Sequence, residues 1–327
     1  MLSRVADSIY WMSRYVERAE NVARFVDVNL NLMLDSPRTD QQWQPLVNTT
    51  GDHADFASRY GAVASAENVI QFLTFDRQNP NSIISCLRAA RENARSVREI
   101  ISSEMWLHLN TFYLMVNSAA SSGKGFEYPH NFFSDVKLAS HLFTGVTDAT
   151  MTHGEAWHFC RLGRKLERAD KTSRILDVKY FILLRSAAEV GTLDDDVQWA
   201  AVLRSASAFE MYRKRQGRIS PTSIVEFLLL DAEFPRAVRF CLNSARDSLH
   251  AISGTPVGLH RKPAEKLLGE ICAELAHARV EEIIQGGLHE YLDALQTNLN
   301  RASTGIYERF FAPRVPESAQ PAKEKGQ

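Results

Sequence analysis

The feature that most constrains the fold of this chain is that its sequence repeats itself. RYVERAENVARFVDV (residues 14–28) matches RKLERADKTSRILDV (residues 164–178), with Arg, Glu-Arg-Ala, Arg and Asp-Val recurring at a constant offset of 150. A second match, at an offset of 155, joins VIQFLTFDRQNPNSIISCLRAAR (residues 69–91) to IVEFLLLDAEFPRAVRFCLNSAR (residues 224–246). Between them, Gln42-Trp43 resembles Gln198-Trp199. Self-similarity of this kind indicates one structural unit used twice.

A chain of 327 residues is also near the usual upper limit for one hydrophobic core. We therefore predict two duplicated helical units, residues 1–150 and 151–312, packed with a pseudo-twofold relation. Residues 313–327 are polar and aperiodic, which predicts a disordered C-terminal tail.

Helix is the dominant element that the sequence predicts, because glycine (16) and proline (11) are scarce and alternating strand patterns are rare. The fold class expected is all-α, a multi-helix bundle. The first helix has an apolar seam at 4-3-4-3 spacing, which is typical of a bundle. Its members are Val5, Ile9, Met12, Val16, Ala19, Ala23, Val26, Leu30 and Met33.

Further helices are predicted by the same periodicity near residues 66–77, 81–120, 131–148, 152–186, 194–214, 222–230, 235–252, 262–285 and 288–311. Loops are expected where Gly, Ser, Pro or Asp cluster, at 35–45, 121–130, 187–193 and 253–261. Asn79 before Pro80 and Ser220 before Pro221 are predicted helix caps, each with proline at the first helical position.

Charge and composition exclude several classes of function. The chain has 38 basic and 39 acidic residues, a net charge of −1, so it has no overall field to attract nucleic acid. Its apolar runs fall short of the roughly 18 residues that cross a bilayer, and its N-terminus is periodic and charged. The four cysteines have no metal-binding spacing. We expect a cytoplasmic protein with reduced thiols and no membrane contact.

The charged positions of the repeat are the candidate functional residues: Arg14, Glu17, Arg18, Arg24, Arg164, Glu167, Arg168 and Arg174. In the first helix they lie opposite the seam, among Tyr10, Trp11 and Phe25, so the helix is expected to be buried on two sides. Charges there must be paired, with Arg14–Glu17 and Glu20–Arg24 at suitable spacings. Two interpretations stay open: a buried ion-pair network, or a pocket of arginines that binds a carboxylate or phosphate.

Motifs for catalysis are weak. Glu155 with His158, and Glu274 with His277, have the Glu-x-x-His spacing of di-iron bundles, but they do not occupy equivalent positions of the repeat. The sequence shows no recognisable nucleophile, so the catalytic residues are unknown, and we expect no metal and no cofactor. The chain is more consistent with a non-enzyme, and a di-metal protein is the distant alternative.

At ERAENVAR and ERADKTSR the sequence resembles the alpha-E family, a bacterial helical domain of unknown function named for its Glu-Arg motif. The likeness continues through NPNSIISCLRAARENAR, EFLLLDAEFPRAVRFCL and GLHEYLDALQTNLN to about residue 312. Carried over, the motif positions are Glu17, Arg18, Glu167 and Arg168.

Members of this family are typically encoded beside, or fused to, circularly permuted ATP-grasp ligase-like proteins and transglutaminase-like peptidases. The resemblance therefore implies a non-catalytic partner, or a substrate-presenting subunit, of an ATP-grasp-type amide ligase in peptide synthesis or modification. The alternative is an enzyme that acts on a peptide or amide through Glu17 or Glu167. Oligomerisation is left open.

Overall fold

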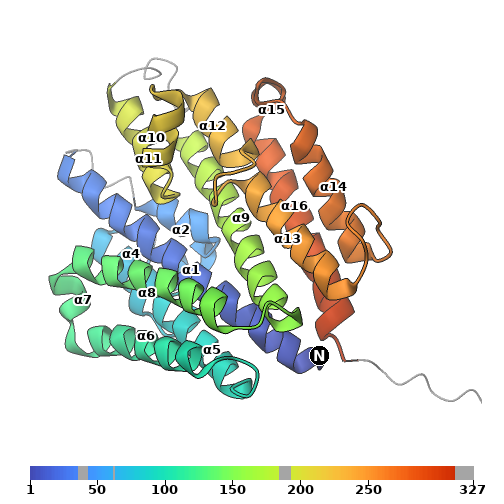
Figure 1. Cartoon of the computed structure of the whole chain (residues 1–327). Coiled ribbons are helices and arrows are strands. Elements are labelled where there is room, and N and C mark those ends of the chain that lie inside the picture. The colour runs from blue at the N-terminus through green and yellow to red at the C-terminus, as the bar shows by residue number, and fades with distance from the viewer. Residues whose placement is uncertain (36–42, 62, 184–192, 314–327) are drawn as a thin grey trace, which may run out of the picture.

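The computed structural model describes residues 1–35, 43–61, 63–183 and 193–313. All regular structure in these residues is helical, which confirms the all-α prediction. The predicted loop at 187–193 and the predicted tail lie almost wholly outside the described residues. Figure 1 shows two long helices crossing the middle of the molecule, with shorter helices around them.

The first part of the chain contains α1 (Ser3–Asp35), α2 (Gln44–Thr50), α3 (His53–Tyr60), α4 (Ala66–Ile70), the π-helical turn η2 (Gln71–Phe75), α5 (Ile83–Ser96), α6 (Ser103–Ser122), α7 (Lys124–Glu127) and α8 (Pro129–Thr150). The second part contains α9 (Glu155–Leu183), α10 (Leu193–Ser205), α11 (Phe209–Gln216), α12 (Pro221–Leu230), α13 (Val238–Ser253), α14 (Pro263–His277), α15 (Val280–Gly286), α16 (Leu288–Ile306) and the π-helical turn η3 (Tyr307–Phe311).

Three of the predicted helices are each two helices in the structure. The 81–120 prediction divides into α5 and α6, since Ser102 begins α6 by accepting a hydrogen bond from the Met105 amide at 3.1 Å. The 194–214 prediction breaks at Ser207, whose φ of 49° leaves the helical region. The 262–285 prediction breaks between α14 and α15. Periodicity alone misses such breaks because the apolar pattern continues across them.

Of the two predicted helix caps, one marks the start of a helix and the other does not. Pro221 is the first residue of α12, as predicted, although the Ser220 side chain makes no cap hydrogen bond. Asn79 does not cap a helix: its side chain accepts from the Asn81 amide at 2.8 Å and so forms a turn. The cap of α5 is Ser82, which accepts from the Ser85 amide.

The helices α1 and α9 form the centre of the bundle. On one side α5 and α8 pack against α1, and on the other side α13 and α16 pack against α9 (Figure 1). The middle of the predicted seam of α1, from Ile9 to Val26, is fully buried. Tyr10, Phe25 and Leu32 on the opposite side are buried too, so α1 is enclosed on two sides, as predicted. The charged residues of α1 therefore lie in the interior of the protein.

Candidate functional site

Small residues let α1 and α9 approach closely where their charged residues meet. Gly163 of α9 packs against the backbone of α1: a Cβ atom there would lie 2.4 Å from the Tyr10 carbonyl oxygen and 3.2 Å from Arg14 Cγ. The residue at the corresponding position of α1 is Ser13, which is also buried. This contact brings the two Glu-Arg motifs within reach of each other.

The two Glu-Arg motifs pair with each other across the helix interface. Arg168 of α9 donates from Nε and Nη2 to the two oxygens of Glu17 on α1, at 2.8 and 2.7 Å. Reciprocally, Arg18 of α1 donates from Nε and Nη2 to Glu167 on α9, at 2.7 and 3.0 Å. Each motif thus supplies the carboxylate for one bidentate pair and the guanidinium for the other.

Arg14 completes the second pair by donating to Glu167 Oε2 at 2.9 Å. The predicted Arg14–Glu17 pair is therefore wrong: Arg14 reaches the opposite helix instead of the residue one turn along. The predicted Glu20–Arg24 pair is confirmed, and both members are buried. Glu20 also accepts hydrogen bonds from His141 and Ser140 of α8, at 2.9 and 3.1 Å.

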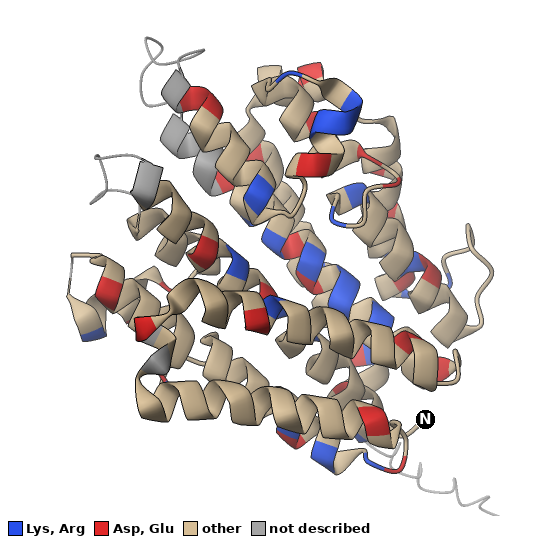
Figure 2. Ribbon diagram, turned by 60° about the vertical axis from the view of Figure 1, so that its left-hand side comes forward, with Lys and Arg blue, Asp and Glu red and all other residues tan. Residues whose placement is uncertain are grey.

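The two remaining predicted arginines lie at the ends of the cluster. Arg174 donates to Asp170 in its own helix at 3.0 Å. Arg164 has Asp148 as its nearest carboxylate, with 3.7 Å between nitrogen and oxygen. All eight predicted residues thus belong to one charged cluster around α1 and α9, where Figure 2 shows basic and acidic residues in close succession.

Arg236 is a member of the cluster that sequence analysis missed. It lies just before α13 and donates to Glu17 at 3.2 Å and to Glu20. Asn81 holds the matching place in the first unit, where it accepts from Arg18 at 2.6 Å. The 155-residue offset aligns these two positions, so the repeat contained a signal for both. Their different side chains concealed it.

Burial and pairing fix the charge states of the motif glutamates. Glu17 and Glu167 are 1% and 0% exposed, and burial by itself would raise their pKa. The guanidinium groups outweigh burial: Arg168 and Arg236 lower the pKa of Glu17, and Arg18 and Arg14 lower that of Glu167. Both carboxylates are ionised and fully engaged. A general acid or base needs a carboxyl whose pKa is raised, so this geometry does not favour the enzyme alternative.

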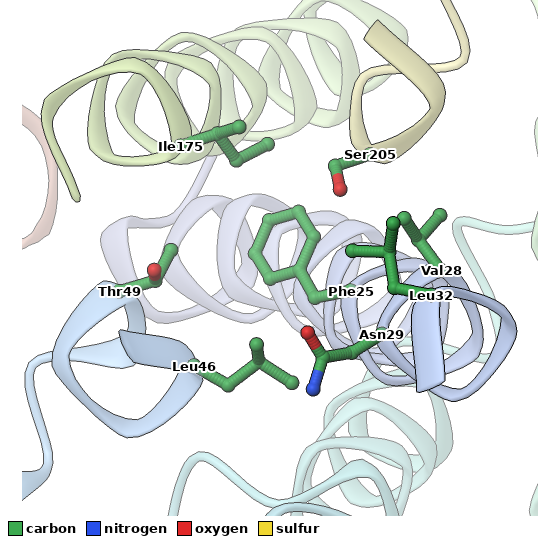
Figure 3. A pocket seen from close by; sticks show the side chains of 8 residues that line it. All are labelled: Phe25, Val28, Asn29, Leu32, Leu46, Thr49, Ile175 and Ser205. Atoms are coloured by element: carbon green, nitrogen blue, oxygen red, sulfur yellow. The ribbon is translucent and has the colours of Figure 1, made fainter. Parts of the chain in front are cut away.

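Two hollows in the described chain lie away from the paired oxygens. One, of about 20 Å³, is lined by residues of α1, α2, α9 and α10, and Figure 3 shows Phe25, Asn29 and Thr49 at its edge. It has room for about one water molecule. A shallow depression of about 330 Å³ lies between Ile100 and Glu155 at the other end of α9.

The histidine motifs form no metal centre in the described residues, where no three histidine, cysteine, aspartate or glutamate side chains converge. Glu155 instead pairs with the amino group of Met1 at 3.0 Å. None of the described helices is long and apolar enough to span a membrane.

Comparison with known proteins gives a family but no established activity. Over residues 1–311 the chain matches the Alpha-E family, described as a predicted alpha-helical domain with a conserved ER motif. Uncharacterised proteins of Mycobacterium bovis and Mycobacterium tuberculosis are each 25% identical over 323 residues, which cover 93% of this chain and 35% of theirs. The chain thus spans about a third of the length of these relatives. No solved structure matches. The chain belongs to the Alpha-E family.

Proposed function

We propose that this chain is a non-catalytic helical partner, or a substrate-presenting subunit, of an ATP-grasp-type amide ligase in peptide synthesis or modification. One observation carries the proposal: both motif glutamates are engaged in ion pairs. The role of the motif that this supports is structural. The family resemblance supports the proposal. So does the length of the relatives, in which the matched region is one part of a longer chain.

The Glu-Arg motif is too enclosed to be the contact surface, because the side chains of its arginines are 12–16% exposed. A better surface is the outer side of α6 and α8, which we name the α6–α8 face: Leu107, Leu114, Leu138 and Leu142, exposed by 65, 50, 61 and 55%. Exposed apolar side chains gathered on neighbouring helices mark a protein-binding surface. The only charged residue of α6 is Glu104.

Both helices are apolar on two sides. Their inner sides fill the core through Leu109 and Phe112 of α6 and through Val136 and Phe143 of α8. Packing within this chain accounts for those residues and leaves the outer leucines unexplained. We infer that they cover an apolar surface of the ligase.

A pull-down with a circularly permuted ATP-grasp ligase-like protein from the same organism tests the proposal, with a transglutaminase-like peptidase as a second bait. The test variant is Leu107→Glu with Leu138→Glu, and the control is Leu259→Glu, a leucine that is 50% exposed in the loop before α14. We expect wild type and control to be retained and the double variant to be lost. Failure of the wild type to bind either bait, or equal retention of the double variant, would contradict the proposal.

We also infer the duplication predicted from sequence. It is supported by the reciprocal Glu-Arg pairs and by a second matched contact: His130 contacts Asp27 at 2.8 Å, and His289 contacts Asp177 at 2.6 Å. The two aspartates stand 150 residues apart, at equivalent positions of the repeat. A cytoplasmic location stays a prediction.

A further inference from the structure

Four basic residues form a row on one side of α9, which we name the α9 cationic row: Arg161, Arg164, Lys165 and Arg168. Spacings of three and four residues place them on neighbouring turns of the helix. Arg161 donates to Ser248 of α13 at 3.3 Å, and Arg168 is paired with Glu17. Arg164 and Lys165, which lie between them in the row, make no hydrogen bond to the described chain.

Lys165 is a buried cation that makes no ion pair with the described chain. It is 8% exposed, and its ammonium group lies 4.5 Å from the centre of the Phe240 ring. Among the described residues, no carboxylate lies within ion-pair distance of its Nζ. Arg164 is 12% exposed, makes no hydrogen bond to the described chain, and has only Asp148 at 3.7 Å. Unpaired buried charge costs several kcal/mol, so such residues need a reason to be there.

The matching residues of α1 show that the helix interface does not require these cations. Positions 11, 14, 15 and 18 align with the row at the 150-residue offset, and they hold Trp, Arg, Tyr and Arg. There the two arginines are paired with Glu167, and Arg18 stacks on the Tyr15 ring at 5.7 Å. Arg14 and Arg18 thus form their ion pairs with two neutral residues, Trp11 and Tyr15, at the other two positions.

The excess positive charge is therefore confined to the α9 side. Arg161 and Lys165 stand where α1 has Trp11 and Tyr15. Arg236, close to the row through its contact with Glu17, stands where the first unit has Asn81. Arg161, Lys165 and Arg236 thus carry three positive charges that the equivalent positions of the first unit lack, and Lys165 makes no ion pair with the described chain.

We propose that Arg164 and Lys165 bind a small doubly charged oxyanion, the phosphate group of a metabolite, with Arg161 and Arg168 flanking it. Two adjacent cations without full partners match a group of about two negative charges, which a phosphate monoester carries at neutral pH and a single carboxylate does not. The guanidinium supplies a planar fork of donors, and the ammonium supplies a compact charge. This site does not depend on the ligase proposed above.

Titration calorimetry with inorganic phosphate tests the site. The variants are Lys165→Met, which removes the ammonium group and leaves a long unbranched apolar side chain beside Phe240, and Arg164→Gln. The control is Lys266→Met, which removes an exposed lysine of α14. We expect each site variant to weaken binding at least tenfold and the control to match wild type. Absence of phosphate binding by wild type, or equal affinity in Lys165→Met, would overturn the proposal.

Citrate is the comparison ligand, because it carries several charges on carboxylates instead of phosphate oxygens. Weaker binding of citrate than of phosphate supports the phosphate assignment, and citrate binding without phosphate binding refutes it. Loss of folding is not expected to confuse the result, since Lys165→Met removes an unpaired buried charge. Its melting temperature should equal or exceed that of wild type.

The pH dependence gives an independent readout. Burial lowers the pKa of Lys165 to about 8, and the facing Arg168 and Arg164 add to this effect, against Cys241 of α13 and Glu17 of α1. Anion binding requires the charged amine, so affinity for sulfate, whose own charge is constant in this range, should be highest below pH 8 and fall above it. A flat profile in wild type would exclude Lys165 from the site.

Discussion

Replacing Glu167 with glutamine should destabilise the fold by about 3–5 kcal/mol, because it removes the carboxylate partner of buried cations. Glu167 is 0% exposed and accepts from Arg14 and Arg18 at 2.7–3.0 Å, while Lys171 lies 3.9 Å away. The amide keeps the shape but leaves these cations without a negative charge. They are too enclosed to regain full hydration.

Urea unfolding followed by circular dichroism, with linear extrapolation to water, measures this change. The control is Glu282→Gln. This helical glutamate is 69% exposed, and its ion pair with Arg279 is loose, with 4.0 Å between nitrogen and oxygen. It should change the free energy of unfolding by less than about 0.5 kcal/mol. A loss below about 1 kcal/mol for Glu167→Gln would refute the argument that the motif is a buried lock.

The remaining predictions concern pH, thiols and the two units. The folded state lowers the pKa of Glu17, Glu20 and Glu167 from 4.5, so the unfolded chain takes up protons first on acidification. The stability that these carboxylates contribute is present above pH 4.5 and should decline as the pH falls below it. Glu167→Gln lacks one of the three carboxylates and should decline less steeply, and a wild-type profile no steeper than that of Glu167→Gln would contradict this. A hydrogen bond to Asp177 raises the pKa of His289 above 6.5, so this contact should stabilise the fold below that pH and lose its effect as the pH rises through the raised value. NMR titration should show a smaller rise of this pKa in Asp177→Asn, where Glu290 and Asp293 remain, and an unchanged pKa would contradict the contact. Because all four cysteines are buried, with the pKa of Cys86 raised to about 12 and that of Cys160 to about 11, a thiol reagent should react slowly until denaturant is added, and fast native reaction would be evidence against the packing. Residues 1–150 and 151–312, expressed as separate chains, should co-purify through the α1–α9 interface, and independent monomers would count against it.

Much of the fold could be predicted from sequence because α1 and α9 carry strong periodic signals. The seam of α1 and its second apolar side identified a helix buried on both sides, and the structure bears this out at Tyr10 and Phe25. Helix ends were harder, because they depend on local hydrogen bonds. Ser82, rather than Asn79, caps α5, and both residues are plausible caps by type.

The sequence predicted which residues belong to the charged cluster, but not which of them pair with each other. The repeat singled out Glu17, Arg18, Glu167 and Arg168, and sequence spacing then suggested partners within one helix. In the structure Arg14 pairs across the interface instead. The sequence pattern of one helix does not specify which side chains of another helix it will face. Contacts between residues some 150 positions apart can therefore be assigned only once the packing of α1 on α9 is known. Arg236 was missed because the first unit has an asparagine, Asn81, at the equivalent position of the repeat.

The most direct test of the reciprocal ion-pair lock is a double-mutant cycle between Glu17 and Arg168. Glu17→Gln, Arg168→Met and the double variant would be compared with wild type by urea unfolding. The structure predicts a coupling energy of at least about 1.5 kcal/mol, since two short hydrogen bonds, at 2.8 and 2.7 Å, join these side chains. Additive single-variant losses, with coupling near zero, would contradict the pairing of the two motifs.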